Sequence, residues 1–285
     1  MAGLAICAVA RDEARSIAQW VAFHLLQGAD LVRVLDDGST DGTTDLLHAM
    51  AAVDPRIEVA PWHREGDNFD AAQQKAYGEA ALEMAGRFAF IACIDIDIDE
   101  YLHASDGRIL SDHLAGIAPD IAAIAVGETL FGSSGHGEPG PGLVIERFTR
   151  CAPPGDEAGR WFKTIARPEQ VERYDSVHSV VLRGGRYVMA DLAPLERQGH
   201  HPGQAARAAQ GVIALHHYRV KSLGEFREKQ HRWRDRDITP RYADMYYVET
   251  ELAANRAENA SLRAHAPALR AMLARLGQPA PPPCV

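Results

Sequence analysis

The sequence predicts an α/β fold with a mostly parallel sheet, and two observations indicate it. Over about the first hundred residues, short apolar runs of strand length alternate with amphipathic segments of helical periodicity. Strands that alternate with helices usually form a parallel sheet with right-handed crossover connections. The second observation is size, because a chain of 285 residues can bury a large core. That length suits one domain with an appendage as well as two domains.

The first half is expected to alternate strictly between strands and helices. Gly28 ends the first expected helix, because glycine readily takes the left-handed conformation that closes a helix. Thr43 or Asp41 can cap the second expected helix. The expected strands cover residues 4–9, 31–35, 57–59 and a run from Phe88, and the expected helices begin near Ile17, Thr44 and Asn68.

The second half loses this alternation. A glycine-rich loop at 131–142 interrupts it, and a segment at 190–211 that contains Pro, Gly and Gln is expected to be mobile or to face an acceptor. Ser222 can cap a basic helix at 222–234, with Glu225 in the capping-box position. Further strands are expected near residues 121–126, 143–149, 162–166, 177–182, 186–189 and 212–218.

The C-terminal part, residues 242–276, is rich in alanine, leucine, arginine and glutamate, with Leu262, Leu269 and Leu276 at heptad spacing. This segment can pack on its own domain or on a partner subunit, and three heptad leucines do not decide between the two. A homo-oligomer formed through the C-terminal helix is therefore one open expectation. Residues 279–285 are expected to form a disordered tail.

Two acid-rich turns follow expected strands. Asp36 and Asp37 end the second strand, and the acids of 95–100 end the strand that begins at Phe88. In parallel sheets, ligands bind beyond the carboxyl ends of the strands. We therefore expect the two turns to flank one crevice.

The alternating acids of the second turn indicate a metal ion. If the strand stays extended, Asp95, Asp97 and Asp99 lie on one face, since side chains alternate with a period of two. Three like charges on a buried face repel each other and require compensation. A divalent cation such as Mg²⁺ or Mn²⁺ is the simplest compensation. The alternative is that the strand ends at Asp95 and that the other acids belong to a solvated turn.

Composition excludes some classes of function. The formal net charge is −9, which argues against a general nucleic-acid binder. The four cysteines are far apart and lack CxxC spacing, which is typical of reduced thiols in a cytosolic protein. No apolar run reaches membrane-spanning length, and the N-terminal run lacks the basic residues of a signal peptide. We expect a cytoplasmic protein, either free or peripheral at the inner face of the membrane.

Several motifs, in the right order over about residues 4–235, resemble those of the family 2 glycosyltransferases, in particular the branch related to family 92. DDGSTDGT at 36–43 resembles the acidic turn on the nucleotide side of that family, and IDIDEYL at 96–102 resembles its Asp-x-Asp-Glu-aromatic motif. Further matches lie at 10–13, 20–24, 131–135, 146–149, 163–168 before His178, and 217–222, and the resemblance rests on their number and order.

The resemblance implies a GT-A fold, which is a Rossmann-like, mixed and mostly parallel sheet flanked by helices, here with a C-terminal helical extension. It implies a GT-A catalytic domain at 1–220, with a nucleotide-binding half at 1–103 and an acceptor half at 104–220, followed by the helical segment 221–278 and the tail 279–285. The implied activity is metal-dependent transfer of a sugar, with inversion, from a nucleotide diphosphate donor to a glycan, glycolipid or glycoconjugate acceptor. A UDP-sugar is favoured because Asp37 suits a base with a ring N–H.

The resemblance also implies roles for single residues. Asp97 and Asp99 would hold Mn²⁺ or Mg²⁺, with His178 or His217 completing the shell, and Asp99 would act in catalysis through the metal. Glu128 is the candidate general base, with Asp156 and Asp175 as competitors. The implied donor-binding residues are Ala10, Arg11, Glu13, Asp36, Asp37, Arg64, Asp97, Lys163 and Lys221.

Each role has a structural alternative. Asp37 can simply cap the following helix. A histidine beside strand residues is often a satisfied core group, and Lys221 can be a solvated residue at the start of a helix. Two other functions also stay open: a non-catalytic carbohydrate- or nucleotide-binding domain and a sugar nucleotidyltransferase.

Overall fold

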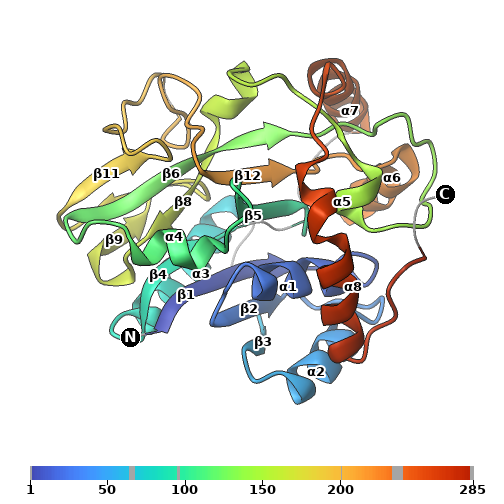
Figure 1. Ribbon diagram of the computed structural model, residues 1–285, viewed down its shortest axis with the longest axis horizontal. Helices are drawn as coiled ribbons and strands as arrows, with labels where there is room; N and C mark the ends of the chain where they lie inside the picture. Colours follow the sequence, from blue (N-terminus) through green and yellow to red (C-terminus); the bar gives the residue numbers. More distant parts are fainter. Residues whose placement is uncertain (1, 64–67, 95–96, 200, 233–239, 283–285) are drawn as a thin grey trace.

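A nine-stranded sheet forms the centre of the structure, a computed structural model (Figure 1). The residues described are 2–63, 68–94, 97–199, 201–232 and 240–282. The strands of the sheet are β1 (Ala2–Ala10), β2 (Leu31–Asp36), β3 (Ile57–Pro61), β4 (Phe88–Cys93), β5 (Glu100–Ala104), β6 (Ile121–Leu130), β8 (Phe162–Ala166), β11 (Arg186–Met189) and β12 (Ile213–His217). Outside it are β7 (Arg150–Cys151), β9 (Val171–Tyr174), β10 (Val180–Leu182) and β13 (Ala257–Glu258).

The strand order is β3-β2-β1-β4-β8-β6-β12-β5, with β11 also beside β6. The first four of these strands run parallel to one another, and β11 and β12 run parallel to β6. β8 is antiparallel to both β4 and β6, and β5 is antiparallel to β12. The predicted mixed, mostly parallel sheet is confirmed, and the arrangement is consistent with a GT-A-like fold.

Helices cover both faces of the sheet. Residues of α1, α2, α4 and α8 share one apolar cluster with β1 and β2, whereas α3 packs with the β9–β10 hairpin on the opposite face. The helices are α1 (Ile17–Leu26), α2 (Thr43–Val53), α3 (Phe69–Met84), α4 (Leu110–Ala115), α5 (Val144–Arg147), α6 (Leu223–Arg232), α7 (Pro240–Ala254) and α8 (Ala266–Arg275).

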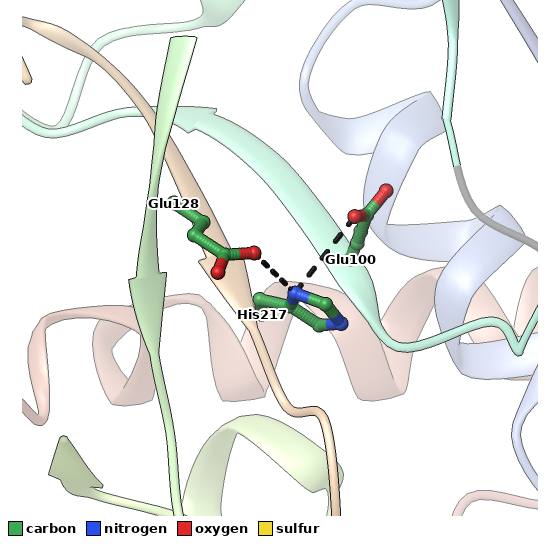
Figure 2. A group of neighbouring side chains, drawn as sticks. All are labelled: Glu100, Glu128 and His217. Carbon is green, nitrogen blue, oxygen red and sulfur yellow. Dashed lines mark hydrogen bonds and ion pairs between the residues drawn. The ribbon is translucent and has the colours of Figure 1, made fainter. Parts of the chain in front are cut away.

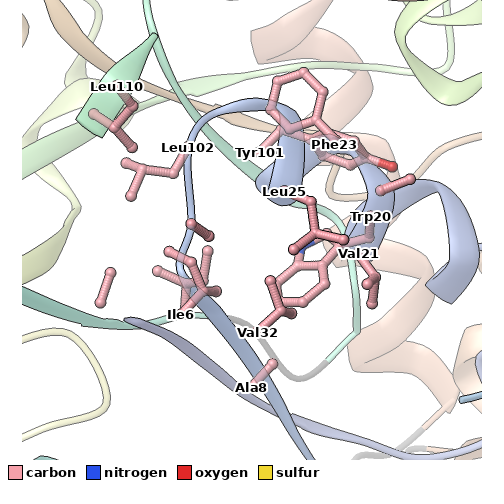
Figure 3. Packing of buried hydrophobic residues seen from close by; sticks show 14 of the residues in the cluster. Ile6, Ala8, Trp20, Val21, Phe23, Leu25, Val32, Tyr101, Leu102 and Leu110 are labelled. Atoms are coloured by element: carbon pink, nitrogen blue, oxygen red, sulfur yellow. The ribbon is translucent and has the colours of Figure 1, made fainter. Parts of the chain in front are cut away.

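The central strand β1 is buried on both faces, as its continuous apolar sequence predicts. Ile6 and Ala8 face the cluster that contains Trp20 of α1 (Figure 3). Cys7 and Val9 face the cluster of α3 on the other side of the sheet. This double burial makes β1 the strand on which both helical layers are built.

Helix α1 is bonded directly to β5. The Trp20 indole Nε1 donates to the Glu100 carbonyl at 2.7 Å, and the Leu102 backbone N–H donates to His24 Nε2 at 3.2 Å. His24 Nδ1 lies 2.9 Å from the Trp20 carbonyl, so this nitrogen carries the proton. The imidazole is therefore neutral, and it fixes the position at which β5 begins.

The chain after β4 differs from the extended strand considered above. β4 ends at Cys93, residues 97–98 form a bend, and Ile98 has a φ of 51°. Asp97 and Asp99 are buried, so the alternative of a solvated turn is also wrong for these two acids. Asp95 lies outside the described residues. The bend lets β5 leave β4 and pair with β12 at the far end of the sheet order.

The three heptad leucines of the C-terminal part pack on their own chain. Leu262, Leu269 and Leu276 are buried in the cluster that contains α1, so they offer no surface to a partner subunit, and a homo-oligomer stays a prediction.

The strand expected at 143–149 is wrong, because Val144–Arg147 forms the short helix α5. Among the described residues, no helix is both long and apolar enough to span a bilayer.

We predict that His24→Gln flattens the pH dependence of stability below neutrality. Burial lowers the pKa of His24 from 6.5 to about 3, so between these values the unfolded chain binds a proton that the folded chain excludes. The free energy of unfolding of the natural protein should therefore fall as the pH drops from 6.5 to 4, with this residue contributing up to about 1.4 kcal/mol per pH unit. Urea unfolding of both proteins across this range measures the slopes, and parallel curves would contradict the assignment.

Candidate functional site

Ionisable side chains from distant parts of the chain meet at one edge of the sheet (Figure 2). Glu128 lies near the carboxyl end of β6, His217 ends the parallel β12, and Glu100 begins the antiparallel β5 directly opposite His217. Lys163, the second residue of the antiparallel β8, lies at the same edge. This is the carboxyl edge of the parallel strands, where a ligand site is expected in such sheets.

A cavity of about 710 Å³ opens at this edge. Its volume is within the range of pockets that hold small organic ligands. Acids and aromatic rings line it together. The lining includes Asp97, Asp99, Glu100, Glu128, Phe69, Trp161, His178, His201, Tyr242 and Tyr246.

His217 lies at the centre of the acids. Its Nδ1 is 2.6 Å from Glu128 Oε2 and 3.9 Å from Glu100 Oε1, and its Nε2 is 3.2 Å from Asp99 Oδ1. Burial alone would lower the pKa of His217, but the carboxylates of Asp99 and Glu128 outweigh burial and raise it to about 10. The imidazole is therefore a cation at neutral pH.

Lys229 of α6 lies between the two aspartates of the bend. Its Nζ is 2.6 Å from Asp99 Oδ2 and 3.1 Å from Asp97 Oδ2, and it also donates to the Arg219 carbonyl at 3.0 Å. All three side chains of this group are buried. Two further contacts link acids to cations: Arg219 Nη2 lies 2.9 Å from Glu128 Oε1, and Lys163 Nζ lies 3.5 Å from Glu100 Oε2.

Cations of the protein itself thus balance the four carboxylates. Compensation does not depend on a divalent cation alone, because Lys163, His217, Arg219 and Lys229 supply positive charge at contact distance, and binding of a metal stays a prediction. No functional role was predicted for Lys229, Arg219 or Glu100. The available signal for Lys229 was its spacing of three residues from Phe226, which places both side chains on the buried face of α6.

These contacts set the protonation of the acids. Burial would raise the pKa of Asp99, but Lys229 and His217 hold it well below its ordinary value. Burial would also raise the pKa of Glu128, but Arg219 and His217 outweigh burial and lower it. At Glu100 burial dominates and raises the pKa despite the nearby Lys163. The cavity therefore presents carboxyl groups with different proton affinities.

A buried ion pair fixes α6, and so the position of Lys229. Ser222 and Glu225 form the capping contacts that the sequence predicts: Ser222 N and Oγ both donate to Glu225 Oε2, and the Glu225 N–H donates to Ser222 Oγ. Arg147 of α5 binds Glu225 through two bonds of 2.9 and 2.7 Å. The first turn of α6 is therefore held from two sides.

The two loops that follow β1 and β2 are bonded to each other. The Thr40 N–H donates to Asp12 Oδ1 at 2.6 Å, and the Glu13 N–H donates to Thr43 Oγ1 at 2.7 Å. A smaller cavity of about 230 Å³ extends from these loops to the charged cluster, because Glu13 and Asp99 both line it. Asp99, Arg219 and Lys229 line both cavities, so the two adjoin.

The donor residues expected at these loops lie in two groups. Ala10, Arg11 and Asp37 come together: the Asp37 N–H donates to the Ala10 carbonyl at 2.8 Å, and Arg11 Nη1 is 3.9 Å from Asp37 Oδ2. Asp36 instead accepts bonds from Ser39 Oγ and Thr44 Oγ1, which is a loop-closing contact at the start of α2. Asp37 lines neither cavity.

The other expected residues have varied surroundings. Lys221 is buried, not solvated, and donates to Ser16 Oγ and the Ile98 carbonyl, so it joins the α1 loop to the bend. His178 lines the larger cavity, with Nδ1 3.0 Å from the Phe162 carbonyl, and burial holds its pKa well below its ordinary value. Arg64 lies outside the described residues.

The cluster contains suitable metal ligands. Within the described ranges, ligand atoms of Glu100, Glu128 and His217 lie within 4.8 Å of one another, and His178 is not part of this group. Carboxylate oxygens with one imidazole suit Mn²⁺ or Mg²⁺, so the donor set fits the expected ion. His217 can bind a metal only after it loses a proton. Asp97 and Asp99 can bind a metal only after Lys229 moves away from them.

Part of the chain is similar to proteins of glycosyltransferase family 92. Residues 3–130 match the model of glycosyltransferase family 92. The chain is 24% identical over 240 residues to a glycosyltransferase family 92 protein of Ricinus communis, covering 80% of this chain and 37% of that protein. It is 24% identical over 236 residues to a family 92 protein of Oryza sativa subsp. japonica, covering 79% and 35%.

The chain thus spans little more than a third of these two relatives. The matches support the resemblance to family 92, whereas the wider resemblance to family 2 and the Asp-x-Asp assignment stay predictions.

We predict that Arg147→Met destabilises the protein by about 3–5 kcal/mol, because it leaves the buried Glu225 carboxylate without its guanidinium partner. Urea unfolding measures the effect. The double variant Arg147→Met/Glu225→Gln is the matched control, and it should regain a large part of the loss because no unpaired charge remains. A single variant within 1 kcal/mol of the natural protein would contradict the anchoring role.

Proposed function

We propose, on the premise of the similarity to family 92 glycosyltransferases, that the protein is a metal-dependent, inverting glycosyltransferase of the hexosyltransferase type. It moves a sugar from a nucleotide diphosphate donor, for which a UDP-sugar is favoured, to a glycan, glycolipid or glycoconjugate acceptor. The observation that carries the proposal is the cluster of four charge-compensated carboxylates that line a 710 Å³ cavity.

The donor is proposed to extend from the part of the loops after β1 and β2 that lies outside the two cavities into the smaller cavity and towards the larger one. The group of Ala10, Arg11 and Asp37 offers a carboxylate and a guanidinium to the nucleobase. From there the loop that contains Glu13 leads into the smaller cavity, which ends at Asp99 and Lys229. The diphosphate would thus meet the cationic side chains Arg219 and Lys229, which suit phosphate oxygens.

Asp97 and Asp99 are the residues proposed to hold the metal, and His217 is proposed to join them as a ligand only after it loses a proton. A bound divalent cation supplies Lewis-acid stabilisation to the charge that develops on the leaving diphosphate. Both carboxylates are buried, and Asp99 is ionised at neutral pH, as a ligand must be. The neighbouring cations keep these acids charged before any donor arrives.

Glu128 is proposed as the general base of a direct displacement. Its pKa is lowered, so the carboxylate is ionised and can accept a proton from an acceptor hydroxyl. Its bonds to Arg219 and His217 hold it in one orientation at the cavity wall. Asp156 caps a short 3₁₀ helix (Glu157–Arg160) and pairs with Arg256, and Asp175 pairs with Arg197. These contacts favour Glu128 over both competitors.

The acceptor is proposed to enter past the aromatic part of the larger cavity. Trp161 packs against His201, with ring centroids 4.6 Å apart, and Tyr242 of α7 is half exposed. Flat rings of this kind cover the apolar faces of sugars. Since α6 and α7 supply Lys229, Tyr242 and Tyr246 to the cavity, the catalytic unit is proposed to extend beyond residue 220 into the helical segment 221–278.

We predict that a nucleoside diphosphate raises the melting temperature only when a divalent cation is present. Ligands that bind the native state stabilise it. UDP, GDP and CDP, each with Mn²⁺ or with EDTA, form the panel, and UDP with Mn²⁺ should give the largest shift. Asp99→Asn should abolish the metal-dependent part of that shift. Failure of all three nucleotides to move the melting temperature with Mn²⁺ would sink the donor assignment.

We predict that Glu128→Gln lowers kcat by a factor of about 10²–10⁴ and leaves the donor-induced melting shift intact. The amide keeps the shape of the side chain but cannot take a proton. Transfer to a glycan acceptor and hydrolysis of the donor are measured for both proteins. A binding module without catalysis would show the melting shift in both proteins and turnover in neither, and an unchanged kcat would exclude Glu128 as the base.

A further inference from the structure

Lys229 occupies the position that a cation would take between Asp97 and Asp99. An ammonium group has three hydrogens, and the contacts described for this one include three acceptors: a carboxylate oxygen of each aspartate and the Arg219 carbonyl. The Lys229 side chain is buried, so these contacts replace its hydration.

Both oxygens of Asp99 already face cations of the protein. Oδ2 is 2.6 Å from Lys229 Nζ, and Oδ1 is 3.2 Å from His217 Nε2. A divalent cation cannot coordinate either oxygen at ligand distance while the ammonium and the imidazolium both keep their places, because like charges at such separations repel strongly. Binding of the metal to Asp99 therefore requires displacement of one of these two groups.

Lys229 is the group with room to move. His217 belongs to β12, and β5 and β6 flank it on both sides. Lys229 reaches the aspartates through a flexible stem, and this residue lines the smaller cavity as well as the larger one. The anchored first turn of α6 keeps the base of that stem in place while the end swings.

We propose that Lys229 is an internal counter-ion that a divalent cation displaces from Asp97 and Asp99, and that the displaced ammonium then binds the diphosphate of the donor. The inference rests on the proposed function and adds a coupling to it. Metal alone binds weakly because it must compete with Lys229, whereas metal and diphosphate together bind strongly because the ammonium finds a new anionic partner.

The test is the affinity for Mn²⁺ alone, measured by isothermal titration calorimetry on the full chain. Lys229→Met should bind Mn²⁺ at least tenfold more tightly than the natural protein, because the competing charge is gone. Lys75→Met is the matched control: it makes the same change in net charge at an exposed residue of α3 and should leave the affinity unchanged. Equal or weaker Mn²⁺ binding by Lys229→Met would overturn the proposal.

A second titration tests whether the displaced ammonium of Lys229 binds a diphosphate. Inorganic pyrophosphate should enhance Mn²⁺ binding in the natural protein and enhance it at least tenfold less in Lys229→Met. An equal enhancement in both would remove the second half of the proposal. If Lys229→Met folds only with Mn²⁺ present, that rescue itself supports the competition. If it does not fold at all, Lys229→Gln, which keeps a polar group, replaces it in both titrations.

Should neither variant fold, the natural protein decides by NMR of its ¹⁵N-labelled lysine side chains. Saturation with Mg²⁺ should shift the Lys229 ammonium resonance, and an unchanged resonance would show that metal and ammonium coexist. Failure here is distinct from failure of the proposed function. A nucleotide-dependent melting shift without tighter Mn²⁺ binding in the variant refutes only the Lys229 proposal. The reverse pattern refutes the proposed donor site, and of the Lys229 proposal it leaves only the competition with the metal.

Discussion

The balance of charge at the carboxyl edge of the sheet is the constraint on which the rest of the structure depends. Four carboxylates are buried at this edge, those of Asp97, Asp99, Glu100 and Glu128. An isolated charge in such a place costs too much free energy to persist. Each carboxylate is therefore in contact with a cation, and these cations come from β8, β12, the chain just after it and α6. The second half of the chain thus completes a site whose acids β5, β6 and the bend before β5 supply.

The fold provides the rigidity that this arrangement requires. Bonds from Trp20 and His24 fix the start of β5, and with it Glu100. The bidentate pair of Arg147 and Glu225 fixes the start of α6, and with it the base of the Lys229 side chain. Because neither anchor lines the larger cavity, the charged groups there stay available to a ligand.

Much of the sheet could be predicted from the sequence, and the charge partners could not. The alternation of strands and helices predicted the parallel half of the sheet, because continuous apolar runs such as residues 4–9 are typical of strands buried on both faces. The bend at 97–98 was missed, since alternation of Asp and Ile is equally compatible with an extended strand. Lys229 was missed because a lysine on a basic helix is usually solvated, and 130 residues separate it from Asp99. Only tertiary structure brings such a pair together, whereas the capping pair of Ser222 and Glu225 is local and was predicted.

The most direct test of the charge-balanced donor site is a crystal structure of the protein with UDP and Mn²⁺, with an anomalous difference map recorded at the manganese absorption edge. The account predicts one manganese peak within bonding distance of the Asp97 and Asp99 carboxylates, with the Lys229 ammonium turned from them to the diphosphate. A nucleotide bound away from these acids, or a manganese peak elsewhere with Lys229 still between the two aspartates, would contradict it.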